Sequence, residues 1–381
     1  MSHWPLNVSN FSKTDKLKIC SFFVESNFWT QADKVLEFER SFAKYTGTKN
    51  SLFVSSGSAA NTILAMYLKD TCEKKKVIFP STTWITSVSP FVREGFDPVF
   101  VDVNLHDFSI DLNKLEEILQ QQAEEIACVF FTSLLGYTPD IGKIKDLCGK
   151  YKVKVMMDNC ENTFGLYDNQ NISSFFTSTT STYFGHQIQS VEGGFIFTND
   201  DDVYEYGLMA RNHGMTRSLG NVAYKYRNPL VDPKFEFQIL GNNFRNTNIN
   251  AYIGTLDFQR IKEYEEKRIV NYIHFSENLD LDKFYLPPIR EKCVDYPFAL
   301  PIICKTKESK VKALRLCDSL KIESRPIISG NLLRQNAFRK YAIYQKFKNS
   351  ELLNENGFYV GSHNQVKQSQ IENFCQGLNN I

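Results

Sequence analysis

Short apolar runs alternate with amphipathic stretches through most of the first half of the chain. The runs are rich in Val, Ile, Phe and Met, which is typical of strands that a parallel sheet buries on both faces. We expect strands over residues 51–55, 77–79, 99–101, 127–131, 153–157, 178–184 and 195–198. Between them, apolar residues spaced by three and four predict helices, for example over 111–121 and 140–151. This alternation predicts a doubly wound α/β sheet, whose ligands lie outside the carboxyl ends of its strands.

The pattern changes after about residue 255. A helix rich in Glu, Lys and Arg is expected over 256–270, and further strands are expected over 298–304, 321–328 and 358–361, with helices between them. No internal repeat or low-complexity linker separates the two parts. We therefore expect a large α/β domain with an N-terminal arm, residues 1–255, packed against a smaller α+β domain, residues 256–381.

Composition and charge argue against nucleic acid or a membrane as a partner. The 381 residues are 42% hydrophobic and 23% charged, which is ordinary for a globular protein. Lys plus Arg number 44 against 43 for Asp plus Glu, so no basic surface for a polyanion is indicated. No apolar run approaches the roughly 20 residues of a membrane span, and the first residues lack the pattern of a signal peptide. We expect small molecules or a second copy of the chain as partners.

The nine cysteines are scattered along the chain, without any C-x-x-C or C-x-C spacing. This pattern is typical of reduced thiols rather than of a disulfide framework, a zinc site or an iron–sulfur cluster. We therefore expect a cytoplasmic protein that binds no metal.

Small residues follow the first expected strand. Residues 56–59, Ser-Gly-Ser-Ala, form a turn before an expected helix. Such a turn leaves backbone N–H groups free at the helix N-terminus, where these donors and the helix dipole stabilise a phosphate. Alone, this signal is weak, because most turns of this kind bind nothing.

Three unusual residues stand near the ends of other expected strands: Trp84, Asp158 and His186. A buried carboxylate at Asp158 needs a partner, which could be a ligand, a helix N-terminus or a buried cation. Trp84 alone would more often belong to core or interface packing. His186 could move protons near neutral pH, or could be a structural histidine whose hydrogen bonds are satisfied.

From about residue 30 to the C-terminus, the chain contains motifs that resemble those of the DegT/DnrJ/EryC1/StrS family of sugar aminotransferases and that follow one another in the same order. The resemblance is carried by Ser-Gly-Ser-Ala at 56–59, Pro-Ser-Thr-Thr-Trp at 80–84, Asp-Asn-Cys-Glu at 158–161 and Glu-Gly-Gly at 192–194. It implies an aspartate-aminotransferase-like fold (fold type I), whose large domain has a seven-stranded, mostly parallel sheet. It also implies pyridoxal 5'-phosphate or pyridoxamine 5'-phosphate as the cofactor.

The resemblance also implies cofactor contacts at individual positions. The residues concerned before the Glu-Gly-Gly run are Gly57, Ser58, Ala59, Trp84, Asp158, Glu161 and Ser181. The turn at 57–59 and the Ser181 hydroxyl would bind the cofactor phosphate. The Trp84 ring would lie against the cofactor ring, and the charge of Asp158 would keep the pyridinium nitrogen protonated, so that the ring accepts electrons.

One position departs from the aminotransferase pattern. The family places a lysine six residues before the Glu of Glu-Gly-Gly, and the residue six before Glu192 is His186. A lysine amine can bond covalently to pyridoxal phosphate, whereas an imidazole cannot, so the cofactor would stay untethered as pyridoxamine phosphate. Within the family, histidine at this position resembles the 3-dehydratases that make 3-deoxysugars. This implies that His186 is the catalytic base in deoxygenation of a nucleotide-linked 4-keto-6-deoxyhexose at C3, with GDP-4-keto-6-deoxymannose as the expected substrate and L-glutamate as amino donor. The implied role is deoxysugar synthesis for surface polysaccharide.

Further motifs are implied to hold the substrate and a second subunit. His213 lies in Arg-Asn-His-Gly, and Asn243 and Arg245 lie in Gly-Asn-Asn-Phe-Arg. In the family, the asparagine of this loop reaches the cofactor phosphate of the other subunit, which implies a homodimer with shared active sites. Arg325 and Asn331 lie in Ser-Arg-Pro-Ile-Ile-Ser-Gly-Asn, where Arg325 could contact a substrate or donor carboxylate.

Three alternatives remain open. A related branch of dehydratases for CDP-linked sugars also carries the histidine but uses an iron–sulfur centre, from which the cysteine spacing here departs. The chain could instead be an aminotransferase that uses another lysine, with Lys154 or Lys225 as candidates. It could also be a protein that binds the cofactor without turning over a ketosugar.

Overall fold

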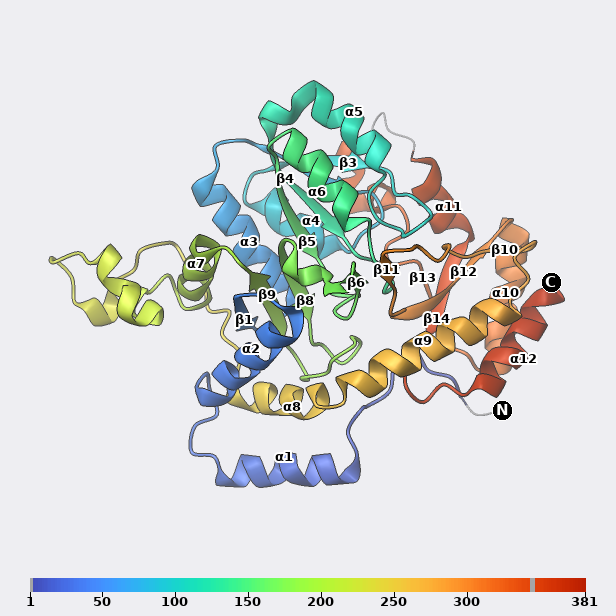
Figure 1. The fold of residues 1–381 in the computed structure, drawn as a ribbon, viewed down its shortest axis with the longest axis horizontal. Coiled ribbons are helices and arrows are strands. Elements are labelled where there is room, and N and C mark those ends of the chain that lie inside the picture. Colours follow the sequence, from blue (N-terminus) through green and yellow to red (C-terminus); the bar gives the residue numbers. More distant parts are fainter. Residues whose placement is uncertain (1–2, 343–346) are drawn as a thin grey trace.

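The computed structural model describes residues 3–342 and 347–381, which form one large and one smaller layered unit (Figure 1). The large unit is built on a seven-stranded sheet in the order β1-β9-β8-β5-β4-β2-β3. Its strands are β1 Asn50–Val54, β2 Lys76–Pro80, β3 Asp97–Val101, β4 Ile126–Thr132, β5 Lys154–Asp158, β8 Thr177–Ser181 and β9 Gly194–Thr198. All seven expected strands are present. They run parallel except β9, which is antiparallel to β1 and β8.

Helices cover both faces of this sheet, as the alternating pattern predicts. They are α2 Asp33–Thr46, α3 Gly57–Thr71, α4 Ile85–Arg93, α5 Leu112–Gln122, α6 Ile141–Lys150 and α7 Asp201–Arg211. Within β4, Cys128 and Phe130 pack with α3 and α4, while Val129 and Phe131 pack with α5 and α6. Since successive side chains of a strand point to opposite faces, a run that is apolar throughout must be covered on both sides. This burial explains why continuous apolar runs in the sequence correctly predicted the strands.

The strand expected over 178–184 is shorter than predicted. β8 ends at Ser181, because the backbone of Thr182 bonds to Gly193 at 2.9 Å and to Ser190 at 2.8 Å. The hydroxyl oxygens of Thr182 and Ser190 also lie 2.5 Å apart. These contacts close the neck of a loop over residues 183–189. His186 therefore lies in a loop beyond the sheet and not at the end of a strand.

The helix expected over 256–270 is two helices, α8 Asn248–Phe258 and α9 Ile261–Asn278. The break is polar: the Arg260 guanidinium donates to Asp15 at 2.9 Å and to Asp257 at 3.2 Å. α9 then passes beneath the large unit toward the smaller one (Figure 1). The predicted boundary between residues 255 and 256 falls inside α8, and the division into domains at that residue stays a prediction.

The smaller unit is an antiparallel sheet in the order β10-β12-β14-β13. Its strands are β10 Phe284–Tyr285, β12 Ala299–Cys304, β14 Gly357–Gly361 and β13 Ser324–Pro326, and its helices are α10 Lys307–Leu320, α11 Lys348–Asn356 and α12 Gln368–Asn379. A third, three-stranded sheet joins β6 Leu166–Tyr167 and β7 Gln170–Asn171 to β11 Cys293–Val294. Because β6 and β7 precede α9 in the chain and β11 follows it, this sheet ties the two units together.

The N-terminal arm does not belong to the large unit alone. Trp4 is buried in the core of the smaller unit, where its backbone N–H donates to Lys321 at 3.0 Å and its indole donates to the Gly361 carbonyl at 3.1 Å. The prediction that residues 1–255 form one domain is wrong for this segment. The indole needs both an apolar surface and an acceptor, and the smaller sheet supplies both.

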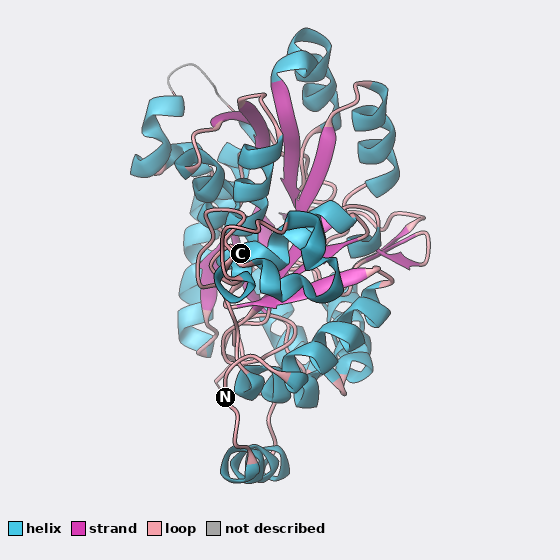
Figure 2. Cartoon of the chain, turned by 90° about the vertical axis from the view of Figure 1, so that its left-hand side faces the viewer, coloured by secondary structure: helices cyan, strands magenta, loops and turns pink. Residues whose placement is uncertain are grey.

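Two segments stand out from the body of the protein in Figure 1, and Figure 2 shows the first of them again from the side. One is helix α1, Lys13–Glu25, which the sequence did not predict, and the other runs between α7 and α8 and includes the 3-10 helices Thr216–Tyr226 and Pro233–Phe235. Both expose large apolar side chains: Leu17, Phe23, Val24, Phe28 and Trp29 near α1, and Tyr224, Leu230, Phe235, Phe237 and Leu240 in the second segment. Contiguous exposed apolar surface of this kind is typical of interfaces. In the part of the chain that the structure describes, no helix combines the length and apolar character needed to cross a bilayer.

Candidate active site

The predicted cofactor residues gather at one edge of the large sheet. β1, β2, β5 and β8 run parallel, so their carboxyl ends meet there. β1 leads into the turn at 57–59, β2 leads to Trp84, β5 ends at Asp158 and β8 ends at Ser181. The topology thus brings together residues separated by more than a hundred positions in the chain.

The turn after β1 forms the first turn of α3. The Ser56 side chain accepts a hydrogen bond from the Ala59 N–H at 3.0 Å and caps the helix. Gly57 lies so close to its neighbours that an added Cβ would be 2.9 Å from the Cys160 sulfur and 3.1 Å from the Ser181 Cβ. The Ser58 hydroxyl instead points toward Thr86, 3.0 Å away. The helix N-terminus and Ser181 therefore share one small region, which suits a phosphate group.

Asp158 is the buried carboxylate of this edge, with 3% of its surface exposed. One oxygen accepts from the Asn61 amide at 2.8 Å and from the Ser87 hydroxyl at 2.7 Å, and the other accepts from the Cys160 N–H at 3.1 Å. Among the described residues no cation is paired with it, so the buried salt bridge considered above is absent. The second oxygen has capacity for a further donor, which a pyridinium N–H would provide.

His186 lies against the smaller unit. Its ring centre is 5.7 Å from that of Phe298, and its Nδ1 is buried without a hydrogen-bond partner among the described residues. Burial lowers the pKa of His186 to about 4, opposed by the Asp158 charge and the Cys160 backbone and reinforced by Arg268. The ring is therefore neutral near pH 7 and can accept a proton. An unpaired buried nitrogen contradicts the alternative of a structural histidine with satisfied bonds.

Glu161 is a second buried carboxyl group next to this edge. It accepts from the Leu135 N–H at 2.8 Å. Burial raises the pKa of Glu161 to about 8, with the Asp158 charge adding to the effect of burial and the Leu135 N–H opposing it. Tyr359 from the smaller unit lies near, since the Glu161 carboxyl raises the pKa of Tyr359. At neutral pH, Glu161 therefore carries its proton.

Trp84 is 55% exposed and precedes α4, so its ring is not part of the core. This contradicts the alternative of core packing and leaves the ring free to contact a ligand or a partner. The carboxyl edge thus offers phosphate donors, an exposed aromatic face and a buried acid. These are the groups that a pyridoxal or pyridoxamine phosphate needs at its phosphate, ring and nitrogen, so the residues present fit that cofactor.

His213, Asn243 and Arg245 come together beside the end of β1. The His213 N–H donates to Asn242 at 2.8 Å, the Arg245 guanidinium donates to the Asn212 side chain, and the Ser55 N–H donates to Phe244 at 2.9 Å. Asn243 itself is exposed. The structure thus places this loop next to the residues that lead into the 57–59 turn, while its contacts with substrate or a second subunit stay a prediction.

Arg325 and Asn331 differ in their freedom to bind a ligand. Arg325 is exposed and lies opposite Tyr359 in the pairing of β13 with β14. Asn331 is buried, and its side chain donates to Glu351 at 2.6 Å and accepts from the Leu333 N–H at 3.0 Å. A substrate contact at Asn331 would have to replace one of these bonds, so a structural role accounts for it in this chain.

The two alternative lysines lie elsewhere. Lys154 begins β5, at the opposite end of the strand from Asp158, and its amine lies 4.9 Å above the Tyr67 ring. Lys225 is an exposed residue paired with Glu205 at 2.9 Å. Neither occupies the carboxyl edge, which disfavours an aminotransferase that uses either one.

Several residues of this site were not found from the sequence. Asn61 and Ser87 hold Asp158, and Phe298 and Tyr359 approach from the smaller unit. A buried asparagine four residues after Gly57, on the same helix face, was a signal for Asn61. The sequence contained no such signal for Phe298, because this residue belongs to the smaller unit and no fixed spacing in the chain relates it to His186.

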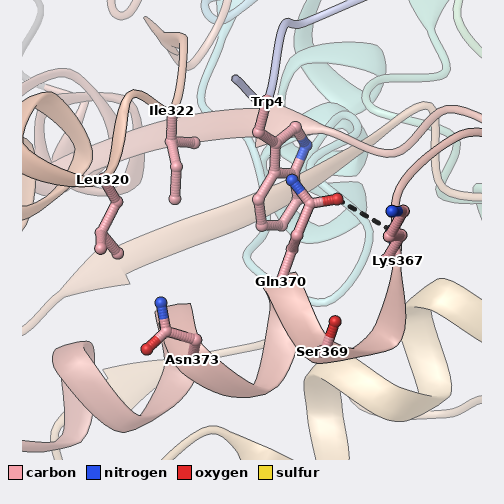
Figure 3. A pocket seen from close by; sticks show the side chains of 7 residues that line it. All are labelled: Trp4, Leu320, Ile322, Lys367, Ser369, Gln370 and Asn373. Atoms are coloured by element: carbon pink, nitrogen blue, oxygen red, sulfur yellow. Dashed lines mark hydrogen bonds between the residues drawn. The ribbon is translucent and has the colours of Figure 1, made fainter. Parts of the chain in front are cut away.

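A cavity of about 350 Å³ is lined by none of the residues of this edge (Figure 3). It opens on the outer face of the smaller unit, between Trp4, Ile322 and the first turn of α12. Lys367 is the one titratable residue among those that line it, and none of the predicted cofactor or catalytic residues is among them. The described residues contain no group of three or more His, Cys, Asp or Glu side chains placed to hold a metal ion.

Comparison with known proteins agrees with this geometry. The profile of the DegT/DnrJ/EryC1/StrS aminotransferase family matches residues 12–379. The GDP-4-keto-6-deoxy-D-mannose 3-dehydratase of Yersinia pseudotuberculosis is 28% identical over 387 residues, covering 98% of this chain and 97% of that protein. The enzyme of the same name from Escherichia coli O55:H7 is 30% identical over 382 residues, covering 95% and 96%.

Solved structures of such dehydratases superpose closely. The E. coli GDP-4-keto-6-deoxy-D-mannose-3-dehydratase with bound hydrated PLP gives a TM-score of 0.89 at 26% identity, covering 99% of this chain and 100% of that chain. A GDP-4-keto-6-deoxymannose-3-dehydratase with a trapped PLP-glutamate geminal diamine gives 0.89 at 25% identity, covering 98% and 100%. The fold type inferred from the sequence is confirmed by these matches.

We predict that Glu161→Gln changes how stability depends on pH in the cofactor-free protein. A carboxyl group with a raised pKa stays protonated in the folded state while the unfolded state ionises, so wild-type stability falls as pH rises from 4.5 to about 8. Glutamine keeps the acceptor for Leu135 and does not titrate. The free energy of unfolding of the variant, relative to wild type, should rise with pH by up to about 1.4 kcal/mol per unit.

Urea unfolding between about pH 5 and 8.5 measures this difference. The matched control is Glu124→Gln, which replaces an exposed glutamate and should leave the wild-type pH profile unchanged. Parallel profiles for wild type and Glu161→Gln would contradict the assignment of a raised pKa to Glu161.

Proposed function

The chain belongs to the DegT/DnrJ/EryC1/StrS aminotransferase family, and we propose that it is a pyridoxamine-phosphate-dependent sugar 3-dehydratase. Its substrate is a nucleotide-linked 4-keto-6-deoxyhexose, with GDP-4-keto-6-deoxymannose as first choice because the similar dehydratases carry that name and match nearly the whole chain. The observation that carries the proposal is His186: a neutral, half-buried imidazole stands where the aminotransferases of the family have lysine.

The residues of the carboxyl edge hold the cofactor. When bound, pyridoxamine phosphate supplies an amine that condenses with the C4 ketone of the sugar and a ring that stores the electrons released beside it. The first turn of α3 and Ser181 bind the phosphate through N–H and O–H donors. Asp158 holds the proton on the pyridinium nitrogen, and Asn61 and Ser87 keep its carboxylate in place.

His186 moves the proton. In its neutral form it takes a proton from the methylene carbon that bears the amine, which creates an imidazolium. The Asp158 charge and the Cys160 carbonyl favour this protonated ring, although its burial does not. The imidazolium then gives the proton to the C3 oxygen, which leaves as water. The products after hydrolysis would be a 3-deoxy-4-keto sugar, ammonia and the cofactor in its pyridoxal form, since the cofactor supplies the two electrons that the deoxygenation needs.

The neutral form of Glu161 limits the negative charge at this edge. Burial is the main reason for the raised pKa of Glu161, and repulsion by the nearby Asp158 carboxylate adds to it. With Glu161 protonated, Asp158 remains the charged group that faces the ring nitrogen. L-Glutamate is the amino donor that restores the amine, a role supported by the dehydratase held with PLP and glutamate.

We infer a homodimer with shared active sites, in the cytoplasm. The exposed apolar side chains of α1 and of the segment between α7 and α8 provide surface for a second copy, and the exposed Asn243 lies beside the phosphate turn. The nine cysteines are all free, which suits a reducing compartment.

Product analysis tests the function directly. We expect wild-type protein, incubated with pyridoxamine phosphate, L-glutamate and GDP-4-keto-6-deoxymannose, to release a 3-deoxy-4-keto sugar that mass spectrometry identifies. The CDP- and dTDP-linked ketosugars in parallel report the nucleotide preference. An amino sugar as the main product would support the aminotransferase alternative, and bound cofactor without any product would support the non-catalytic one.

We predict that His186→Lys binds cofactor but loses dehydration. A lysine can bond covalently to pyridoxal phosphate and so competes with the free amine that the ketosugar needs. Its flexible chain also cannot keep a base in the position of the imidazole. Dehydration should fall by at least about 10²-fold, the lower end of the usual cost of losing a positioned acid–base group.

Borohydride reduction and peptide mapping provide the control for this variant. Wild type should yield no pyridoxyl-lysine, whereas His186→Lys should yield one at residue 186. Dehydration at the wild-type rate in the variant would show that His186 is not the base.

We predict that Asn243→Ala weakens pyridoxamine phosphate binding by about 1–3 kcal/mol, the range for losing a hydrogen bond to a charged group. Titration calorimetry measures the binding, and sedimentation measures the oligomeric state. The neighbouring Asn242→Ala serves as control, because the backbone of Asn242 rather than its side chain contacts His213. A fully active monomer would contradict the shared site.

A further inference from the structure

A second, much smaller cavity lies behind His186. The N-terminal arm at residues 7–10, the loop at 186–189, helix α9 and residues 363–364 enclose it. Its volume of about 10 Å³ is close to the minimum that holds one water molecule. His186, the base of the proposed reaction, is therefore one of the residues that line this cavity.

The N-terminal arm forms one wall of this cavity. The Gln189 side chain donates to the Val8 carbonyl at 2.8 Å and accepts from the Asn10 N–H at 3.2 Å. Asp257 accepts from the Asn10 side chain at 3.0 Å and from the Gln189 N–H at 2.8 Å. These bonds hold the arm over the loop that carries His186.

The titratable and charged groups around the cavity are bonded elsewhere. Tyr264 donates to Asp257 at 2.7 Å, and one guanidinium nitrogen of Arg268 donates to the carbonyls of Pro297 and Phe298. His363 accepts from the Gln365 N–H through Nδ1 at 3.3 Å, so its Nε2 carries the hydrogen toward the Pro5 carbonyl at 3.0 Å. His363 is therefore a neutral ring whose two nitrogens are both occupied.

Three buried polar atoms of the lining residues have no partner in the described part of the protein: His186 Nδ1, Gln187 Oε1 and Asn364 Oδ1. The orientation of Gln187 is fixed, because its Nε2 donates to the Tyr296 carbonyl at 3.0 Å and its oxygen is left over. A buried polar atom without a partner costs about 1–3 kcal/mol. One water could satisfy all three atoms at once.

We propose that this cavity holds one ordered water, and that Gln187 and Asn364 use it to position His186. Both amide oxygens are acceptors, so the water donates its two hydrogens to them and can only accept from His186. The neutral ring then carries its hydrogen on Nδ1, and Nε2 is the base. The Cys160 backbone, which favours the protonated ring, then accepts from Nε2 only after His186 has taken up the proton. Since Nδ1–H also exists in the imidazolium, the same bond holds the ring before and after proton transfer.

The role of His186 as a catalytic base rests on the proposed function, whereas the bound water and the tautomer of His186 do not. The closing experiment therefore reads the tautomer apart from turnover. The protein has six histidines, which allows imidazole nitrogen NMR on ¹⁵N-histidine-labelled protein loaded with pyridoxamine phosphate. The His186→Asn variant assigns the signals. We expect His186 to show a protonated Nδ1 and an unprotonated Nε2 at neutral pH. A neutral ring with its proton on Nε2 would by itself overturn the proposal.

Two substitutions then test the positioning residues. Gln187→Met keeps the length of the side chain and removes the acceptor, and Asn364→Leu does the same on the other side. Each should give a mixture of tautomers and lower the kcat of dehydration on the order of 10²-fold, because the wrong tautomer presents an N–H where a lone pair is needed. KM and the affinity for pyridoxamine phosphate should stay within about 2-fold.

Asn364→Asp provides the matched rescue, since it keeps an acceptor oxygen in the same place. It should keep the Nδ1–H tautomer, whereas a purely structural role would make it resemble Asn364→Leu. An unchanged His186 tautomer in both Gln187→Met and Asn364→Leu would overturn the positioning role. If the tautomer is as expected and no ketosugar is dehydrated, the proposed function fails and the water site stands.

Discussion

The buried carboxylate of Asp158 is the constraint on which the rest of the site depends. Its charge lies at the carboxyl edge of a parallel sheet, held by Asn61, Ser87 and the Cys160 N–H. Burial raises the pKa of Glu161 and lowers that of His186, while the Asp158 charge raises both: it adds to the effect of burial at Glu161 and partly offsets it at His186. Burial therefore leaves an acid that keeps its proton and a base that is free of one beside the same carboxylate.

Contact between the two units completes this environment. His186 would be an ordinary loop histidine if the smaller unit did not bring Phe298 against it and Arg268 behind it. Arg268 holds the backbone of Pro297 and Phe298, so the same residue that disfavours the imidazolium also fixes the ring that buries it. The presence of histidine in place of the family's lysine therefore has two consequences. The covalent bond to the cofactor is lost, and the surrounding packing sets how readily the imidazole takes up a proton.

Much of the large unit could be predicted from the sequence, because its strands are buried on both faces and read as continuous apolar runs. Residues that follow such strands directly, such as Gly57, Trp84 and Asp158, could be placed at one edge once a parallel sheet was inferred. The prediction failed where the local pattern was weak. The break between α8 and α9 and the early end of β8 depend on hydrogen bonds of Arg260 and Thr182 with partners outside their own turns.

The sequence alone determined the class of fold, the family and the histidine that replaces the cofactor lysine, because each of these is a local pattern in a fixed order. Only the tertiary structure decided that the His186 Nδ1 is buried, that Trp4 belongs to the smaller unit and that Gln187 and Asn364 line the same cavity as the imidazole. The physical reason is that burial and hydrogen bonding are properties of contacts. Residues 187 and 364 become neighbours through the packing of the arm, α9 and two sheets, and no spacing in the chain encodes that meeting.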